Sequence, residues 1–87
     1  MRTPSIARQF LQQTLDAVRA VERNDEAPLQ EWLTIHSHHM VCLELATQRG
    51  LISHDEADEW RLCANQAEPG FVRPSPLELR MVAHCAA

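Results

Sequence analysis

Histidine and cysteine side chains gather in one short stretch of the chain, and they are the residues best suited to chemistry. His36, His38 and His39 are followed closely by Cys42. Imidazole nitrogen and thiolate sulfur both suit zinc, and ligands on one helix must recur three or four residues apart to share a face. His36, His39 and Cys42 meet that condition. The stretch is therefore a candidate metal-binding or redox-sensing module.

A closed zinc site needs four ligands. This helix offers three at most, and they do not align well along one face. His54, Cys63, His84 or Cys85 would have to complete the set, and the sequence has no CxxC or HExxH pattern. Core or interface histidines are therefore the default interpretation. We expect no native metal and no cofactor, and we expect His38 to lie on the polar side, in solvent.

The same stretch raises the question of nucleophilic catalysis. His39 and Cys42 could touch on one helix, but a cysteine in mid-helix has no helix N-terminus to lower its pKa. The sequence contains no glycine-rich phosphate loop and no nucleophile elbow. A bundle of 87 residues also has little room for a pocket. We therefore expect a buried, unreactive Cys42 and a protein that is not an enzyme.

The charge balance limits the choice of partner. The chain has 12 acidic residues against 8 basic ones, a net charge of −4, and every basic residue is arginine. Contacts to phosphates supply most of the affinity of nucleic-acid binders, and basic residues also drive attraction to anionic membranes. Nucleic acids and anionic membranes are thus both disfavoured as partners. A basic face on another protein suits this chain better.

The cysteines and the N-terminal residues indicate a compartment. The three cysteines are far apart in the sequence, and the first residues lack the apolar segment of a signal peptide. No apolar run approaches the roughly 20 residues that span a bilayer. These features predict a cytoplasmic protein with free thiols.

The spacing of apolar residues predicts a single all-α domain over residues 1–87, with three helices and a short fourth. The first helix opens with Thr3 as its cap and Pro4 at its first position, and it ends in a polar run, Arg23–Glu26. The other predicted elements are a helix from Pro28 to about Arg49, a helix from Ser53 to about Ala67, and a short last helix opened by Ser75-Pro76-Leu77-Glu78.

A short turn joins the second and third predicted helices. Gly50 can adopt the left-handed conformation that ends a helix, and Ser53 can cap the next one. Glu56, three residues later, can reach back to complete a capping box. The connection is too short for anything but two helices side by side. A helical hairpin over Pro28–Ala67 is therefore the predicted centre of the fold.

Two groups of residues are candidates for binding another protein. Val41 and Leu45 lie off the main apolar face of the second helix, as an uncovered apolar strip. Acidic residues crowd the first turn of the third helix beside a tryptophan, a residue type enriched at interface hot spots. The predicted partner-binding residues are Val41, Leu45, Asp55, Asp58, Glu59 and Trp60. The wide apolar face of the first helix, with the strip, also predicts a homodimer.

The hairpin is similar in spacing to a helix-turn-helix, but its second helix carries the wrong residues. Asp55 and Asp58 occupy the face that would read DNA, and Glu56 and Glu59 replace apolar residues. Carboxylates on that face would repel phosphates. We therefore expect no direct contact with nucleic acid.

The hairpin also carries a family resemblance. Its segments His-Ser-His-His, Gly-Leu-Ile-Ser and Asp-Glu-Ala-Asp-Glu-Trp lie within Trp32–Glu68. In size, acidity and helical plan this half of the chain resembles the small acidic antiactivators of LuxR-type quorum-sensing regulators, of the QslA kind. The resemblance implies a protein that sequesters a transcription activator and blocks its dimerisation or DNA binding. Phage-encoded inhibitors of host proteins share the same general character and remain an alternative.

Overall fold

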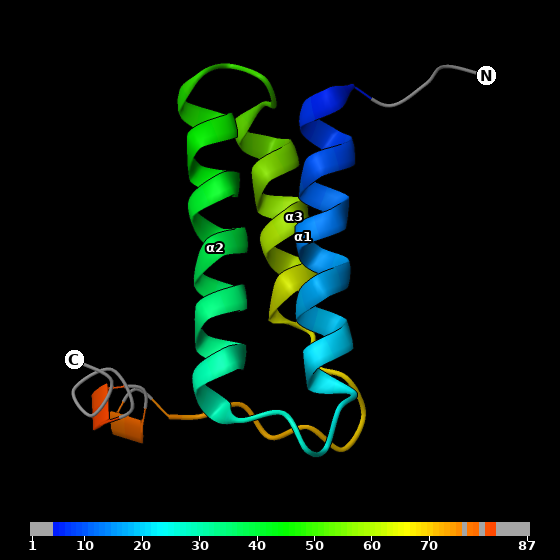
Figure 1. The fold of residues 1–87 in the computed structure, drawn as a ribbon. Helices are drawn as coiled ribbons and strands as arrows, with labels where there is room; N and C mark the ends of the chain where they lie inside the picture. The colour runs from blue at the N-terminus through cyan, green and yellow to red at the C-terminus, as the bar shows by residue number, and fades with distance from the viewer. Residues whose placement is uncertain (1–4, 76, 79, 82–87) are drawn as a thin grey trace.

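The computed structural model describes residues 5–75, 77–78 and 80–81 and forms a bundle of three helices. The helices are α1, Ile6–Glu22, α2, Leu29–Gln48, and α3, His54–Asn65. Figure 1 shows α1 and α2 antiparallel and side by side, with α3 behind them. The described residues include no strand, so the predicted all-α class is confirmed.

The predicted fourth helix falls partly outside the described residues and stays a prediction. Its predicted cap is in place, because the backbone N–H of Glu78 donates to Ser75 Oγ at 3.2 Å. Position 76, position 79 and residues 82–87 are not described. The segment therefore begins with the hydrogen bond of a helix cap.

Two helix starts differ from the predicted ones. Ser5 rather than Thr3 is the N-cap of α1, and its Oγ accepts from the Arg8 N–H at 3.2 Å. Pro28 is the N-cap of α2 and not its first helical residue, since its ψ of 150° is extended. A serine hydroxyl satisfies a free N–H of the first turn as well as a threonine does. The first prediction therefore named the right kind of cap two residues too early, and the second was wrong about the role of Pro28.

The turn between α2 and α3 forms as predicted. Gly50 has a φ of 70°. The Leu51 N–H donates to the Ala46 carbonyl at 2.9 Å, and the Gly50 N–H donates to the Thr47 carbonyl at 3.1 Å, which together are a Schellman motif. Ser53 Oγ then accepts from the N–H at the third helical position at 3.1 Å. The reciprocal half of the capping box was wrong, because the Glu56 carboxylate binds Arg8 instead.

We expect Gly50→Val to lower the free energy of unfolding by about 1 kcal/mol or more, because a β-branched residue resists a positive φ. Nothing lies within 4 Å of a Cβ placed at Gly50, so the cost comes from the backbone and not from a clash. Chemical denaturation measures it. Gly50→Asn is the matched control and should cost less, since asparagine tolerates this conformation. Equal denaturation midpoints for wild type and both variants would show that a side chain at position 50 does not strain the turn.

The core lies where the three helices meet. Its cluster of buried residues is Leu11, Leu43, Ala46, Ile52 and Ala57, with Cys42 and Trp60 packed against it. Ala57 and Ala64 are fully buried, and their small side chains let α3 approach closely. Cys63 and Ala67 are both exposed, because α3 ends at Asn65 and turns only a narrow face inward.

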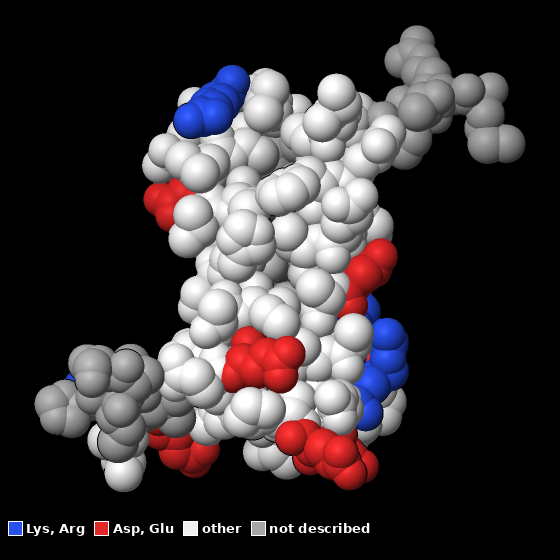
Figure 2. Space-filling view, in the orientation of Figure 1, with Lys and Arg blue, Asp and Glu red and all other residues white. Residues whose placement is uncertain are grey.

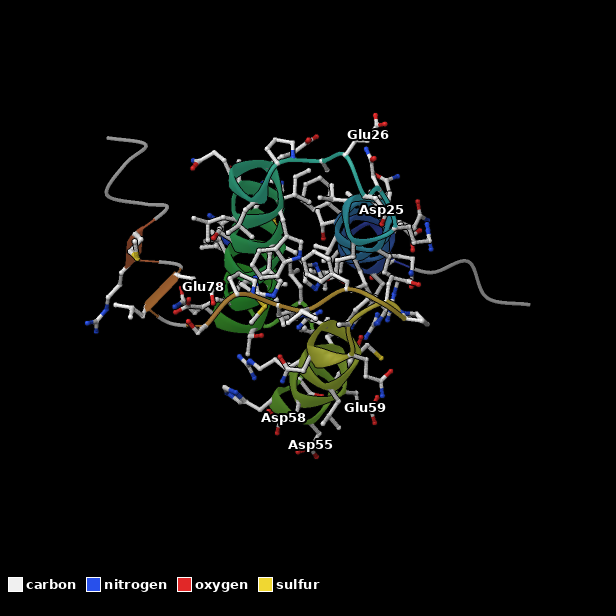
Figure 3. The ribbon with its side chains drawn as sticks, turned by 90° about the horizontal axis from the view of Figure 1, so that it is seen from below. Asp25, Glu26, Asp55, Asp58, Glu59 and Glu78 are labelled. Atoms are coloured by element: carbon white, nitrogen blue, oxygen red, sulfur yellow. The ribbon has the colours of Figure 1, made fainter. Side chains whose placement is uncertain are left out.

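A buried carboxylate ties the segment after α3 to the lower end of the bundle. The Glu22 side chain is 0% exposed. It accepts from Trp32 Nε1–H at 2.8 Å, from the Glu68 N–H at 3.1 Å and from Arg73 Nε at 3.2 Å. Residues 66–74 pass below the ends of α1 and α2 (Figures 1 and 3). A single side chain therefore holds α1, α2 and this segment together.

Candidate protein-binding surfaces

The histidines of α2 are separated rather than gathered. His39 is fully buried, and its Nδ1 lies 2.6 Å from Thr14 Oγ1. The Thr14 hydroxyl donates to the Leu11 carbonyl at 2.9 Å, so we assign its interaction with His39 as acceptance from Nδ1–H. His39 Nε2 is then the unprotonated nitrogen, and it is buried with no hydrogen-bond partner among the described residues. This histidine is a core residue of the α1–α2 contact.

The predicted metal-ligand set does not assemble. The His36 ring stacks on Trp32 at a centroid distance of 4.6 Å, and Cys42 Sγ lies 3.7 Å from Nε2 of His38, not beside His39. Within the part of the chain that the structure describes, no group of three His, Cys, Asp or Glu side chains could hold a metal ion. His84 and Cys85 lie outside that part. Cys42 is only partly buried, which corrects its expected burial.

His36 and His39 both have buried ring nitrogens, and this burial predicts that the fold loses stability in acid. Burial lowers the pKa of His39 below the ordinary 6.5, with further lowering by His36 and His38. Burial also lowers the pKa of His36, aided by Arg73 and opposed by Glu22. Both rings are therefore held neutral in the fold, and the unfolded chain binds more protons below pH 6.5. Stability should be complete above that pH and decrease as the pH falls.

Urea denaturation at pH 7.5, 6.5 and 5.5 measures this dependence, and we expect the midpoint to fall across the series. His54 lies on α3 and is exposed, so His54→Gln should keep the same dependence on pH. His39→Gln should flatten it, because the principal buried titrating group is gone. A midpoint that stays constant over this range would contradict the assignment of His36 and His39 as neutral buried groups.

A groove runs between α1 and α3, and we call it the acidic groove. Its volume is about 480 Å³, and its lining residues are Gln12, Leu15, Ser53, Asp55, Glu56, Glu59, Trp60 and Cys63. The Arg8 guanidinium donates to both Glu56 oxygens, at 2.8 and 2.7 Å. Arg19 Nη2 donates to the Cys63 carbonyl at 3.2 Å. These two arginines of α1 join the helices and fix the shape of the groove.

This groove brings together some of the partner-binding residues predicted on α3, but not all of them. Trp60 is half-buried against the core, and its Nε1–H donates to Glu56 Oε2 at 3.1 Å. Asp55 and Glu59 are exposed and line the groove. Asp58 does not line it and pairs with Arg61 at 3.1 Å. Figure 3 shows Asp55 and Asp58 on the outer side of α3 and Glu59 on the flank of α3 nearer to α1.

Arg8 is a residue of this surface that the sequence did not reveal. Its hydrogen bond lowers the pKa of the Glu56 carboxyl, and the Trp60 indole adds to the effect. The same bond raises the pKa of the Arg8 guanidinium. Glu56 therefore stays ionised and paired. Asp55 and Glu59 are left as the carboxylates of the groove for which no protein partner is observed among the described residues.

Val41 and Leu45 belong to a different surface, the outer face of α1 and α2. They are 54% and 42% exposed, as expected for an uncovered apolar strip. Phe71 does not cover the strip, because it packs near Trp32 at the lower end, with ring centroids 5.7 Å apart. The structure thus divides the predicted partner-binding residues between two faces of the bundle.

The outer face contains two shallow grooves that meet at Phe10. Figure 2 shows that the upper and middle parts of this face are largely uncharged, with one acidic group in its lower centre and the other charged side chains at its ends and margins. The first groove is lined by Phe10, Gln13, Thr14, Ala17, Thr34, Ile35 and His38. The second is lined by Ala7, Phe10, Leu11, Cys42, Leu45, Ala46, Arg49 and Leu51. Among the described residues that line the two grooves, only Arg49, at one end, carries a charge.

Comparison of the chain with protein-family models, with curated proteins and with solved structures gives no match. Among the helices of the described residues, none is both long enough and apolar enough to cross a membrane.

Proposed function

We propose that this chain is a small cytoplasmic regulator that acts by binding another protein through the acidic groove. The observation that carries the proposal is that Trp60 lines the same groove as the exposed carboxylates of Asp55 and Glu59. An aromatic anchor with a charged rim is a common design of protein interfaces. The matching partner surface has an apolar side chain flanked by arginine or lysine.

The electrostatics of the groove support a basic partner. Glu56 is already neutralised by Arg8, so the acids that remain for a partner are those at the rim. The chain as a whole carries a net charge of −4. Complementary charge accelerates association and excludes acidic competitors. The groove thus favours a basic protein surface over a neutral one.

A transcription activator is the partner class that we favour, and the mode we propose is sequestration, as in an antiactivator. DNA-binding surfaces are rich in arginine and lysine, so an acidic chain is suited to cover one. The resemblance of Trp32–Glu68 to antiactivators of LuxR-type regulators supports the same partner class. An inhibitor of phage type would use the same surface on a different target.

Charge reversal tests the groove. Asp55→Arg with Glu59→Arg should weaken capture of the partner at least ten-fold and slow its association, because both rim carboxylates become repulsive to a basic surface. The matched control is Asp25→Arg with Glu26→Arg, which changes the net charge equally at the α1–α2 loop, away from α3 (Figure 3). Tagged protein is incubated with a lysate of the source cells, and captured proteins are identified by mass spectrometry.

Circular dichroism checks that both double variants stay folded, which we expect because exposed charges contribute little to stability. Capture that is equal for wild type and both variants would contradict the groove as the binding surface. The antiactivator mode is tested separately with a purified LuxR-type regulator of the same organism and its operator DNA. Wild type should release the operator in a mobility-shift assay, and persistence of the complex would exclude this mode.

A further inference from the structure

A histidine and a cysteine stand side by side on the outer face of α1 and α2. Nε2 of His38 and Sγ of Cys42 are 3.7 Å apart, one helical turn from each other. Zinc binds histidine nitrogen at about 2.0–2.1 Å and thiolate sulfur at about 2.3 Å in a tetrahedron. Two such ligand atoms on one metal are therefore about 3.6 Å apart. The pair already has the separation of two ligands on one zinc ion.

The surroundings hold this pair in place and leave it open on one side. The Phe10 ring meets the His38 ring edge-on, with centroids 6.1 Å apart and an interplanar angle of 78°. Cys42 packs against the core cluster while His38 is exposed. No third ligand within the described residues is placed to join them. One chain thus presents half of a four-ligand site.

The face that carries the pair suits a second copy of the same chain. Charge opposes the self-association of an acidic protein less where the contact surface has few acidic residues, and the described residues that line both outer-face grooves include none. Phe10 and Leu45 leave 46% and 42% of their surfaces exposed there. A two-fold contact joins the same surface patch of both copies, and residues near the axis meet their own counterparts. If the His38–Cys42 pair of each copy lies near the axis, the two copies together supply two histidines and two cysteines. Pairing of two antiparallel helix pairs is the arrangement of a four-helix bundle.

We propose that two copies of the chain join through the outer face and hold one Zn²⁺ between them, ligated by His38 Nε2 and Cys42 Sγ of each copy. Each thiol gives up its proton on binding, so two protons are released for each zinc ion. Two thiolates balance the two charges of the metal. The completed site is neutral and therefore compatible with an apolar interface. This inference is independent of the proposed function, which uses α3.

The test measures mass and metal together on the full chain. Protein stripped with EDTA is titrated with Zn²⁺ and examined by size-exclusion chromatography with light scattering, and zinc is quantified in the eluted peak. We expect the mass to double with one zinc for two chains, and dimer affinity to rise at least ten-fold over the stripped protein. Co²⁺ in place of Zn²⁺ should give the visible absorption of a tetrahedral site and a thiolate charge-transfer band.

Matched variants locate the ligands. Cys42→Ser and His38→Gln should each abolish the cobalt spectrum and the zinc-dependent mass change. Cys63→Ser and His54→Gln remove an exposed cysteine and an exposed histidine of the same chain and should leave both unchanged. Asp55→Arg with Glu59→Arg should still dimerise with zinc, which separates failure of this proposal from failure of the acidic groove.

Several results would overturn the proposal. One metal ion bound by each monomeric chain would place the site within a single copy. Zinc uptake that survives Cys42→Ser would move the site to other residues. The His38–Cys42 pair does not bridge two copies if the dimer persists unchanged in EDTA. The same conclusion follows if the chain takes up neither zinc nor cobalt.

Discussion

Glu22→Ala should lower the free energy of unfolding by about 3–5 kcal/mol, because it removes the buried carboxylate of an ion pair whose arginine is only partly exposed. The carboxylate is 0% exposed, and its Oε2 lies 3.1 Å from Arg73 Nη2. Its loss also leaves the Trp32 indole N–H and the Glu68 N–H without their acceptor. A domain of this size has a total stability of roughly 4–13 kcal/mol. The variant should therefore be close to unfolding.

Chemical denaturation followed by tryptophan fluorescence measures the loss, because Trp32 donates directly to Glu22. Glu22→Gln keeps the volume and one acceptor oxygen, so it should cost less than the alanine variant. Glu26→Ala is the matched surface control, since Glu26 is exposed, and should stay within about 0.5 kcal/mol of wild type. A Glu22→Ala midpoint equal to that of Glu26→Ala would show that the buried carboxylate does not hold residues 66–74.

Leu43→Ala should be the second large effect, with a loss of about 2–5 kcal/mol from transfer and cavity terms. Leu43 is 0% exposed. It sits in the cluster that Leu11 of α1, Ile52 of the turn and Ala57 of α3 complete. All three helices contact this cluster, so its loss should affect the whole bundle. Denaturant unfolding measures the change in the midpoint at constant slope.

Leu62→Ala is the matched control for this prediction. It removes the same atoms from a leucine of α3 that is 66% exposed, so we expect a change of less than about 0.5 kcal/mol. Similar losses for the two variants would mean that the core does not lie where the three helices meet. A loss at Leu43 that far exceeds the loss at Leu62 is the expected result.

The parts of the fold that could be predicted from the sequence depend on neighbours along the chain. Gly50 and Ser53 act on backbone groups within a few residues, and both act as predicted. The ends of the helices were found to within a few residues for the same reason. The exposed strip at Val41 and Leu45 followed from helical periodicity alone.

The parts that were missed depend on contacts between distant segments. Arg8 and Glu56 are 48 residues apart, and no local pattern indicates that they pair. The role of Glu22 likewise depends on Arg73, 51 residues away. Cys42 was paired with His39 because both lie toward the apolar side of α2, yet burial against α1 directs His39 to Thr14. Cys42 was thus left beside His38.

Hydrogen–deuterium exchange of the chain alone and in complex with its captured partner tests the central claim most directly. We predict slower exchange on binding in peptides that cover Ser53–Cys63, and little change in peptides from the middle of α2. The Asp25→Arg, Glu26→Arg control should give the same pattern. Slower exchange confined to α2, with residues 53–63 unchanged, would contradict the acidic groove as the site of partner binding.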